Sequence, residues 1–186
     1  MNIFFDTEFT ELSRQGQLIS LGMISEDNKS IYCEFEGIDT ESQSDWLKHY
    51  VLRNTVLYGN KYIDDIIYDN TQYFKGSKDD IKHHLETWLS QFKSVQLITD
   101  VSHYDMMLFI DIFGTAFDLP NNVCPYCYDI NQDIARYENI SNKDAFDFSR
   151  EQLLEDNNIE LQGNKHNCLY DALVIKNIYN LINDNA

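Results

Sequence analysis

Basic side chains are scarce in this sequence. Its 186 residues include 14 lysines and arginines against 31 aspartates and glutamates, which gives a formal net charge of −17 at pH 7. This balance argues against a broad basic surface that holds long nucleic acid by releasing counterions. It leaves open contact with a short flexible strand through bridging cations, and it leaves open an acidic protein that imitates nucleic acid.

Long apolar runs and cysteines are also few. No run of about 18 apolar residues occurs, so we expect no span across a membrane. The segment M-N-I-F-F-D lacks the basic start and apolar core of a signal peptide. The cysteines at 33, 124, 127 and 168 are too scattered for a disulfide framework. These features predict a cytoplasmic protein, and the length with 43% hydrophobic residues predicts one globular domain over 1–186.

The order of apolar patterns predicts an α/β fold, with helices packed on a mixed sheet. We expect strands at 2–5, 17–26, 30–36, 95–99 and 124–130, the first three forming an antiparallel meander. We expect helices at 42–52, 77–92, 104–113, 133–138, 144–154 and 166–182. The segment 53–76, rich in Asn, Asp and Tyr, has no clear period and is assigned to no element; a surface excursion that borders the site is one interpretation of it.

Two acids stand at the end of the first expected strand, in the sequence Phe5-Asp6-Thr7-Glu8-Phe9. Because strand side chains alternate between faces, Asp6 and Glu8 point the same way and Thr7 points the other. Two converging carboxylates repel each other unless a cation neutralises them, and oxygen ligands suit Mg²⁺ or Mn²⁺. The alternative is a strand that ends in a polar turn with both acids solvated.

A histidine and an acid open the last expected helix, in Lys165-His166-Asn167-Cys168-Leu169-Tyr170-Asp171. Five helical positions rotate by about 500°, so His166 and Asp171 would not share a face if both were helical. The spacing fits a histidine just before the helix and a carboxylate within it. An imidazole placed there can take a proton from a metal-bound water while Asp171 stays fixed as a ligand.

These motifs, with Tyr104-Asp105 opening the apolar helix between them, resemble the DEDDh 3′–5′ exonucleases of the RNase H-like fold. The segments F-F-D-T-E-F-T-E-L, L-I-S-L-G-M-I-S-E and D-W-L-K-H-Y-V-L are similar to the small single-domain 3′–5′ exoribonucleases of that superfamily. The resemblance runs from Phe4 to about Ile178. It is weakest in 53–76 and 120–162.

The resemblance implies a fold, an activity and a set of residues. The fold would be RNase H-like, with a mixed sheet of the five-stranded type. The activity would be metal-dependent hydrolysis from a single-stranded RNA or DNA 3′ end, releasing nucleoside 5′-monophosphates, with RNA preferred. Two Mg²⁺ or Mn²⁺ ions per site would be held by four carboxylates, with His166 as the general base. By position, those carboxylates are Asp6, Glu8, Asp105 and Asp171.

Several alternatives stay open. Asp100, in T-D-V-S-H-Y-D, ends an expected strand and could replace Asp105 as a ligand, with His103 as a partner behind the ligands. The protein could instead be a 3′–5′ exodeoxyribonuclease, a phosphodiesterase for small nucleotides, or a non-enzymatic acidic mimic of nucleic acid. The sequence does not decide between a monomer and a homodimer.

Three further features have ordinary explanations. Cys124-Pro-Tyr-Cys127 has zinc-like spacing, but no second pair of cysteines or histidines follows at the usual distance. A group of basic residues within 75–93 is interpreted as a solvated helix face, with contact to phosphates as the alternative. Phe9 and Leu12, just after the acids, are either core residues or stacking partners of terminal bases.

Overall fold

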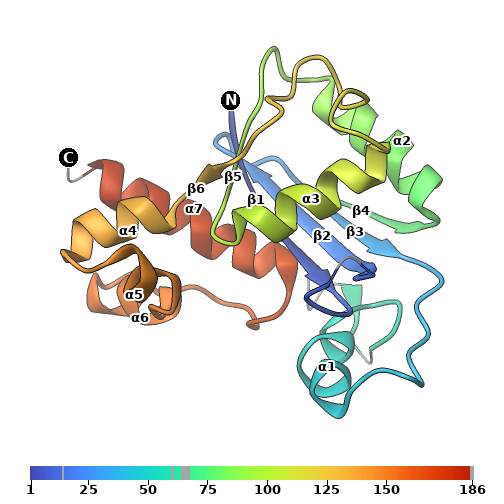
Figure 1. The fold of residues 1–186 in the computed structure, drawn as a ribbon, viewed down its shortest axis with the longest axis horizontal. Helices are drawn as coiled ribbons and strands as arrows, with labels where there is room; N and C mark the ends of the chain where they lie inside the picture. Colours follow the sequence, from blue (N-terminus) through green and yellow to red (C-terminus); the bar gives the residue numbers. More distant parts are fainter. Residues whose placement is uncertain (14, 60, 64–67, 185–186) are drawn as a thin grey trace.

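The computed structural model describes residues 1–13, 15–59, 61–63 and 68–184. Its centre is a six-stranded mixed sheet with the strand order β4-β3-β2-β1-β5-β6 (Figure 1). Strands β1, β2 and β3 form the predicted antiparallel meander; β4 joins β3, β5 joins β1 and β6 joins β5, each in parallel. The strands are β1 (Asn2–Phe9), β2 (Leu18–Ser25), β3 (Ser30–Phe35), β4 (Thr71–Gly76), β5 (Gln96–Thr99) and β6 (Tyr128–Asp129).

Helices cover both faces of the sheet. Helices α2 (Lys78–Leu89) and α3 (Ser102–Phe113) pack on one face, and α7 (Cys168–Asp184) packs on the other (Figure 1). The shorter elements are α1 (Asp45–Tyr50), η1 (Leu52–Asn54), α4 (Asn131–Glu138), α5 (Asn142–Phe146) and α6 (Arg150–Asp156). No helix of the described residues has the length and apolar character that crossing a membrane requires.

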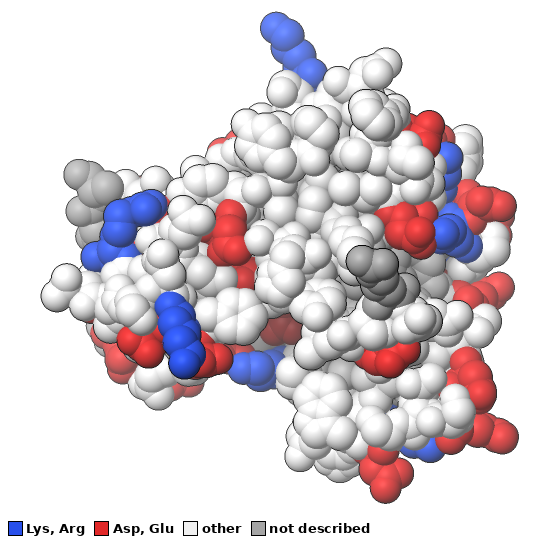
Figure 2. Space-filling model, viewed as in Figure 1, with Lys and Arg blue, Asp and Glu red and all other residues white. Residues whose placement is uncertain are grey.

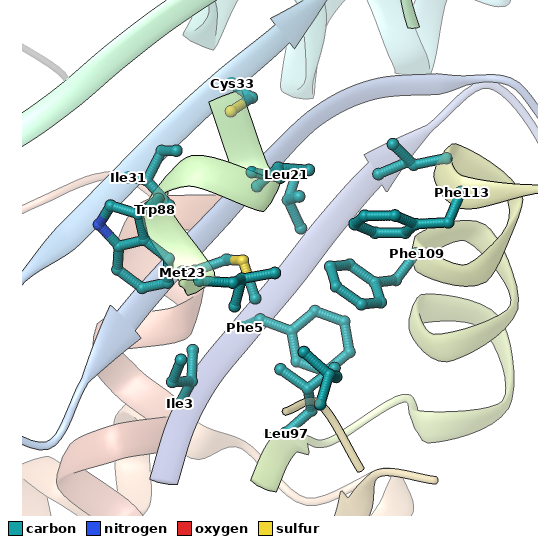
Figure 3. Packing of buried hydrophobic residues seen from close by; sticks show 14 of the residues in the cluster. Ile3, Phe5, Leu21, Met23, Ile31, Cys33, Trp88, Leu97, Phe109 and Phe113 are labelled. Carbon is teal, nitrogen blue, oxygen red and sulfur yellow. The ribbon is translucent and has the colours of Figure 1, made fainter. Parts of the chain in front are cut away.

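Alternation along β1 supplies both layers of the core. Phe5 faces α3, where its ring lies 5.8 Å from that of Phe109 between centroids, and Phe109 in turn lies 5.2 Å from Phe113 (Figure 3). Phe4 points to the opposite face and belongs to the cluster that includes Val174 and other residues of α7. All of these side chains are buried, so β1 is fixed from both sides by apolar contacts.

The predicted α/β class and the meander are confirmed, and several predicted boundaries differ from the structure. The first strand continues through Asp6 and Glu8 to Phe9. The segment 53–76, which shows no clear period in the sequence, contains the last two residues of η1 and the whole of strand β4. The helix expected at 144–154 is two helices, α5 and α6. The last helix begins at Cys168, two residues later than expected, so His166 stands just before it, as its spacing from Asp171 indicated. Strand β4 lacked a sequence signal because an edge strand is only half buried and shows no alternation.

Candidate active site

Asp6 and Glu8 lie on the face of β1 that α7 covers. They pair across the sheet with Gly22 and Ser20 of β2, in regular antiparallel register up to a shift after Glu8. Their position inside the strand, two residues apart, aims both carboxylates to the same side, as predicted. The sheet therefore fixes the separation of the two acids.

Asp171 reaches them because α7 begins unusually close to the sheet. A Cβ at Gly22 would stand 2.4 Å from the backbone nitrogen of Leu169 and 2.5 Å from the carbonyl carbon of Cys168. Only glycine allows that approach, so Gly22 brings the first turn of α7 onto the strand beside Asp6. Asp6, Glu8 and Asp171 each offer an oxygen within 4.8 Å of the others.

Asp105 approaches the same place from the opposite face, on the first turn of α3. It is 1% exposed, and its two oxygens accept hydrogen bonds from Thr7 Oγ1 at 2.6 Å and Thr99 Oγ1 at 2.5 Å. Thr7 points away from Asp6 and Glu8, as alternation requires, and this direction puts its hydroxyl under Asp105. The sequence patterns did not predict that Thr7 and Thr99 hold Asp105. The available signal was a threonine placed between the two acids of the first strand.

Asp100 follows β5 and joins a second group with Asp6 and Asp105, in which ligand oxygens again lie within 4.8 Å of one another. Unlike Asp105, it has a basic partner, since Arg150 Nε donates to Asp100 Oδ2 at 3.0 Å. The same guanidinium donates to the carbonyls of Ala145, Phe146 and Phe148 and to Asn131 Oδ1. Arg150 thus ties the α4–α6 segment to the end of β5, a link without a sequence motif.

The carboxylates form two groups that share Asp6, and both groups of possible metal ligands found among the described residues lie here. Burial and the neighbouring acids raise the pKa of Asp6 and of Asp171 well above the usual range. The pKa of Glu8 rises to about 8, from burial and then from Asp105, and burial raises the pKa of Asp105 to about 7. Such a crowded set of oxygen donors fits hard divalent ions, which would offset the charge that burial otherwise disfavours.

His166 lies just before α7, with a left-handed backbone φ of 62°. Its backbone N–H donates to Asp171 Oδ2 at 3.0 Å, and its ring nitrogen Nδ1 lies 4.0 Å from Glu8 Oε1. The ring meets Trp46 of α1 edge-on, with centroids 5.2 Å apart. Partial burial, and then the charge of Lys165, lower the pKa of His166, so its neutral, proton-accepting form prevails near neutral pH.

These groups line one cleft of about 630 Å³, large enough for a nucleotide. Figure 2 shows it as a hollow between the α5–α6 side and the α1 side of the molecule. Apolar side chains stand on its rim, including Leu12 at 67%, Trp46 at 53% and Phe146 at 47% exposure. Phe9 lines the cleft while its ring stacks on Tyr104 at 5.8 Å, so it is both a packing and a cleft residue.

The remaining sequence features lie outside this cleft. Lys78 of α2 pairs with Asp111 at 2.8 Å, and the ring of His84 stacks on that of Phe74 with centroids 3.7 Å apart. None of these four residues lines the cleft. On the face in Figure 2, the described Lys and Arg side chains stand apart from one another. The Cys127 thiol donates to Ser102 O at 3.5 Å, and burial raises its pKa to about 11, so it stays protonated.

Comparison with known proteins identifies the family. Residues 1–182 match the model of the 3′-5′ exoribonuclease Rv2179c-like domain, and the chain belongs to this family. Two curated relatives from Mycobacterium tuberculosis strains, the 3′-5′ exoribonucleases MT2234.1 (CDC 1551 / Oshkosh) and Rv2179c (ATCC 25618 / H37Rv), are 26% identical to it over 134 residues. Those residues are 71% of this chain and 73% of each relative. The predicted family is confirmed.

Solved structures share the fold. The nuclease domain of 3′hExo, described as a DEDDh family member bound to rAMP, superposes with a TM-score of 0.65 at 14% identity, covering 100% of this chain and 92% of that one. A 3′-exonuclease described in 3′-end-specific recognition of a histone mRNA stem-loop gives 0.67 at 11% identity, with coverages of 100% and 82%. S. pombe Pop2p, with Mg²⁺ and Mn²⁺ bound, gives 0.61 at 16%, with coverages of 98% and 82%. The RNase H-like fold is therefore confirmed.

Proposed function

We propose that this protein is a metal-dependent 3′–5′ exoribonuclease that releases nucleoside 5′-monophosphates from the 3′ end of single-stranded RNA. The observation that carries the proposal is the pair of carboxylate groups joined at Asp6, with a histidine 4.0 Å from Glu8, at one cleft. The names of the family and of the curated relatives supply the preference for RNA. We further propose that 1–186 is one exonuclease domain.

Four carboxylates hold the ions in this proposal: Asp6, Glu8, Asp105 and Asp171. Two Mg²⁺ or Mn²⁺ ions per site would share Asp6, one with Glu8 and Asp171 and the other with Asp105, whose group also includes Asp100. When bound by these carboxylates, the ions would lower the pKa of the attacking water and stabilise charge on the leaving oxygen. The threonines on Asp105 hold its carboxylate in one orientation, which saves reorganisation when an ion binds.

Asp105, rather than Asp100, is the fourth ligand in this proposal. The charge of Asp100 is already offset by Arg150, whose guanidinium is further fixed by carbonyls of the α5–α6 connection. The side chains that donate to Asp105 are the neutral threonines Thr7 and Thr99, so its negative charge is available to a cation. Asp100 then serves to anchor the cleft wall through Arg150.

His166 acts as the general base. Its lowered pKa keeps the imidazole neutral near pH 7, and its position beside Glu8 puts it at the edge of the ligand groups. The imidazole takes the proton of the attacking water, and the Asp171 carboxylate holds the backbone of the same residue. One group thus accepts the proton while the four carboxylates retain the ions.

A short single strand suits this cleft better than a long duplex. The net charge of −17 argues against broad backbone contacts, while bound cations and exposed aromatic side chains can hold one or two terminal nucleotides. A cytoplasmic location stays a prediction of the sequence, and a homodimer stays an open alternative to a monomer.

A panel of 5′-labelled RNA and DNA oligonucleotides of the same sequence tests the proposal. With Mg²⁺ or Mn²⁺ we expect stepwise shortening from the 3′ end, 5′-mononucleotides as products, and faster turnover of RNA. Chelation of the ions should stop the reaction. Faster turnover of DNA would identify an exodeoxyribonuclease. Hydrolysis of dinucleotides but not of longer strands would identify a small-nucleotide phosphodiesterase. If no substrate releases mononucleotides in a metal-dependent way, the acidic mimic is favoured and the proposal is contradicted.

A further inference from the structure

We propose that Asn54, at the end of η1, is a positioning residue that holds the His166 loop in its reactive place. The inference rests on the proposed function, because it assumes that His166 is the base. Asn54 lies 112 positions before His166 in the sequence, and no motif of the chain includes it. Its role follows from the hydrogen bonds that join two distant segments on either side of the histidine.

Asn54 bonds to both neighbours of His166. Its Nδ2 donates to Lys165 O at 3.2 Å, and its own carbonyl accepts from Asn167 Nδ2 at 3.3 Å. The same Nδ2 donates to Tyr50 O at 2.8 Å, which fixes the side chain against α1. One residue therefore bonds to the chain just before and just after the imidazole.

Asn167 links this contact to the start of α7. Its Oδ1 accepts from the backbone nitrogens of Leu169 and Tyr170, each at 3.2 Å, so it caps the helix that carries Asp171. It is 5% exposed; its amide oxygen bonds to the helix and its amide nitrogen bonds to Asn54. The loop and the helix start are thus one hydrogen-bonded unit, with Asn54 as its contact to the α1 side.

The His166 backbone needs such external support. Its φ of 62° lies in the left-handed region, which is strained for a residue with a Cβ and persists when its surroundings impose it. Its own N–H reaches Asp171, while its ring makes edge contacts with Trp46 at 5.2 Å and Tyr50 at 6.4 Å. The α1–η1 segment therefore contacts the His166 ring directly and bonds to the residues just before and just after it.

A buried glutamate anchors that segment to the sheet. Glu34 of β3 is 0% exposed, and it accepts from the backbone nitrogens of Val56 at 2.7 Å and Leu57 at 2.6 Å. Hydroxyls of Tyr32 and Tyr73 complete its hydrogen bonds, at 2.8 and 3.0 Å. A continuous series of contacts runs from β3 through Glu34, the 54–57 turn and Asn54 to His166.

The test compares Asn54→Ala with Asn177→Ala in single-turnover kinetics on RNA at saturating Mn²⁺. Asn177 is a matched control, because its Nδ2 also donates to the carbonyl four residues before it, Leu173 O at 2.8 Å, away from the histidine loop. We expect Asn54→Ala to lower the rate about 10- to 100-fold, as misplacement of a reacting group does, with Mn²⁺ affinity unchanged. Asn177→Ala should keep the wild-type rate.

Two further measurements separate positioning from a general loss of stability. In the His166→Ala background, Asn54→Ala should change the rate by less than about twofold, because the group it positions is gone. Asn54→Asp keeps the size of the side chain and removes the Nδ2 donor, so we expect the same slowing of about 10- to 100-fold in this variant. It tests the inference even if Asn54→Ala folds poorly. An equal slowing in both backgrounds, or full activity of Asn54→Asp, would overturn the inference.

The imidazole spectrum gives a readout that needs no turnover. Among the five histidine ring signals in a proton–carbon NMR spectrum, the one missing in His166→Ala identifies His166. Asn54→Ala should shift or broaden that signal, and Asn177→Ala should leave it unchanged. An unchanged signal in Asn54→Ala would contradict the positioning role, whereas an inactive wild type with a shifted signal would contradict only the proposed function.

Discussion

The floor and the rim of the cleft are built in different ways. The floor carboxylates Asp6, Glu8, Asp105 and Asp171 stand on β1, α3 and α7, regular elements that pack into the core. His166 stands on the rim, in a turn with a left-handed backbone, and its neighbours bond to a segment far away in sequence. Strands and helices that pack into the core fix the spacing of the carboxylates, while a base in a turn depends on contacts from outside its own segment.

This difference matters for what each part can do. A cluster of acids needs close and constant spacing to hold ions, and burial between two packed faces provides it. A base must meet a water and a substrate that come and go, which a rim position allows. The proposed roles therefore predict that ion binding by the floor carboxylates and proton transfer by His166 can be lost independently through separate mutations.

The largest effect is expected from Asp6→Asn, since Asp6 belongs to both carboxylate groups. Turnover should fall to background because both ion positions lose a ligand. Stability without divalent ions should stay equal or rise, as one charge leaves a buried set of like charges. Single-turnover kinetics and thermal unfolding in chelator measure the two effects. Unfolding of the variant would make Asp6 a structural residue instead.

His166→Ala should lower turnover about 10²- to 10⁴-fold, or roughly 3–5 kcal/mol of barrier, without changing the floor. In the wild type, protonation of the imidazole removes the base, so activity should fall as the pH drops through its pKa. Burial lowers that pKa, so the acid limb should lie below the ordinary value of about 6.5. The variant should lose this limb and gain rate with rising pH as hydroxide replaces the base. A wild-type rate in His166→Ala would remove the base from the account.

Gly22→Ala should disturb the floor without removing any acid. Its Cβ would meet backbone atoms of Cys168 and Leu169 at 2.4–2.5 Å, so α7 must move away from β2 and take Asp171 with it. We expect a loss of about 1–3 kcal/mol of unfolding free energy and a clear loss of activity. Gly76→Ala is the control, since its Cβ meets only Asp80 side-chain atoms, at 3.2 Å or more. Equal activity of both variants would show that the close approach is dispensable.

The smallest effect concerns pH and stability without ions. The raised pKa values of Glu8, about 8, and Asp105, about 7, mean that the folded protein holds protons which the unfolded chain releases above its ordinary carboxyl pKa of about 4–4.5. Stability should therefore fall as pH rises from about 5 to 8, by a few degrees in melting temperature. Added Mg²⁺ should remove the decline. Higher stability at pH 8 than at pH 6 in chelator would contradict the buried charge of the floor.

The sequence predicted most of the floor and little of what supports it. Asp6, Glu8, Asp105 and Asp171 could be found because each stands in a short motif at an element boundary, and the structure brings them together. Glu34, Asn54 and Arg150 could not be found, because each bonds to a segment far away in the sequence. Glu34 bonds to a residue 22 positions away and Asn54 to one 111 positions away. Arg150 bonds to residues 19 and 50 positions away. Long-range polar contacts leave no period in a single sequence.

The same reason explains the missed strand. Strand β4 pairs in parallel with β3 across about 40 residues, and its half-buried side chains show neither strict alternation nor a continuous apolar run. The end of β1 was misplaced because polar residues usually mark a turn. Here the strand continues through Asp6 and Glu8, which pair with β2 while their side chains face the cleft.

A calorimetric Mn²⁺ titration of the wild type, Asp6→Asn and His166→Ala tests the division between floor and rim most directly. The account predicts two ions per wild-type site, the same affinity in His166→Ala, and a large loss in Asp6→Asn. A loss of ion affinity in His166→Ala as large as that in Asp6→Asn would make the histidine a ligand and contradict the account.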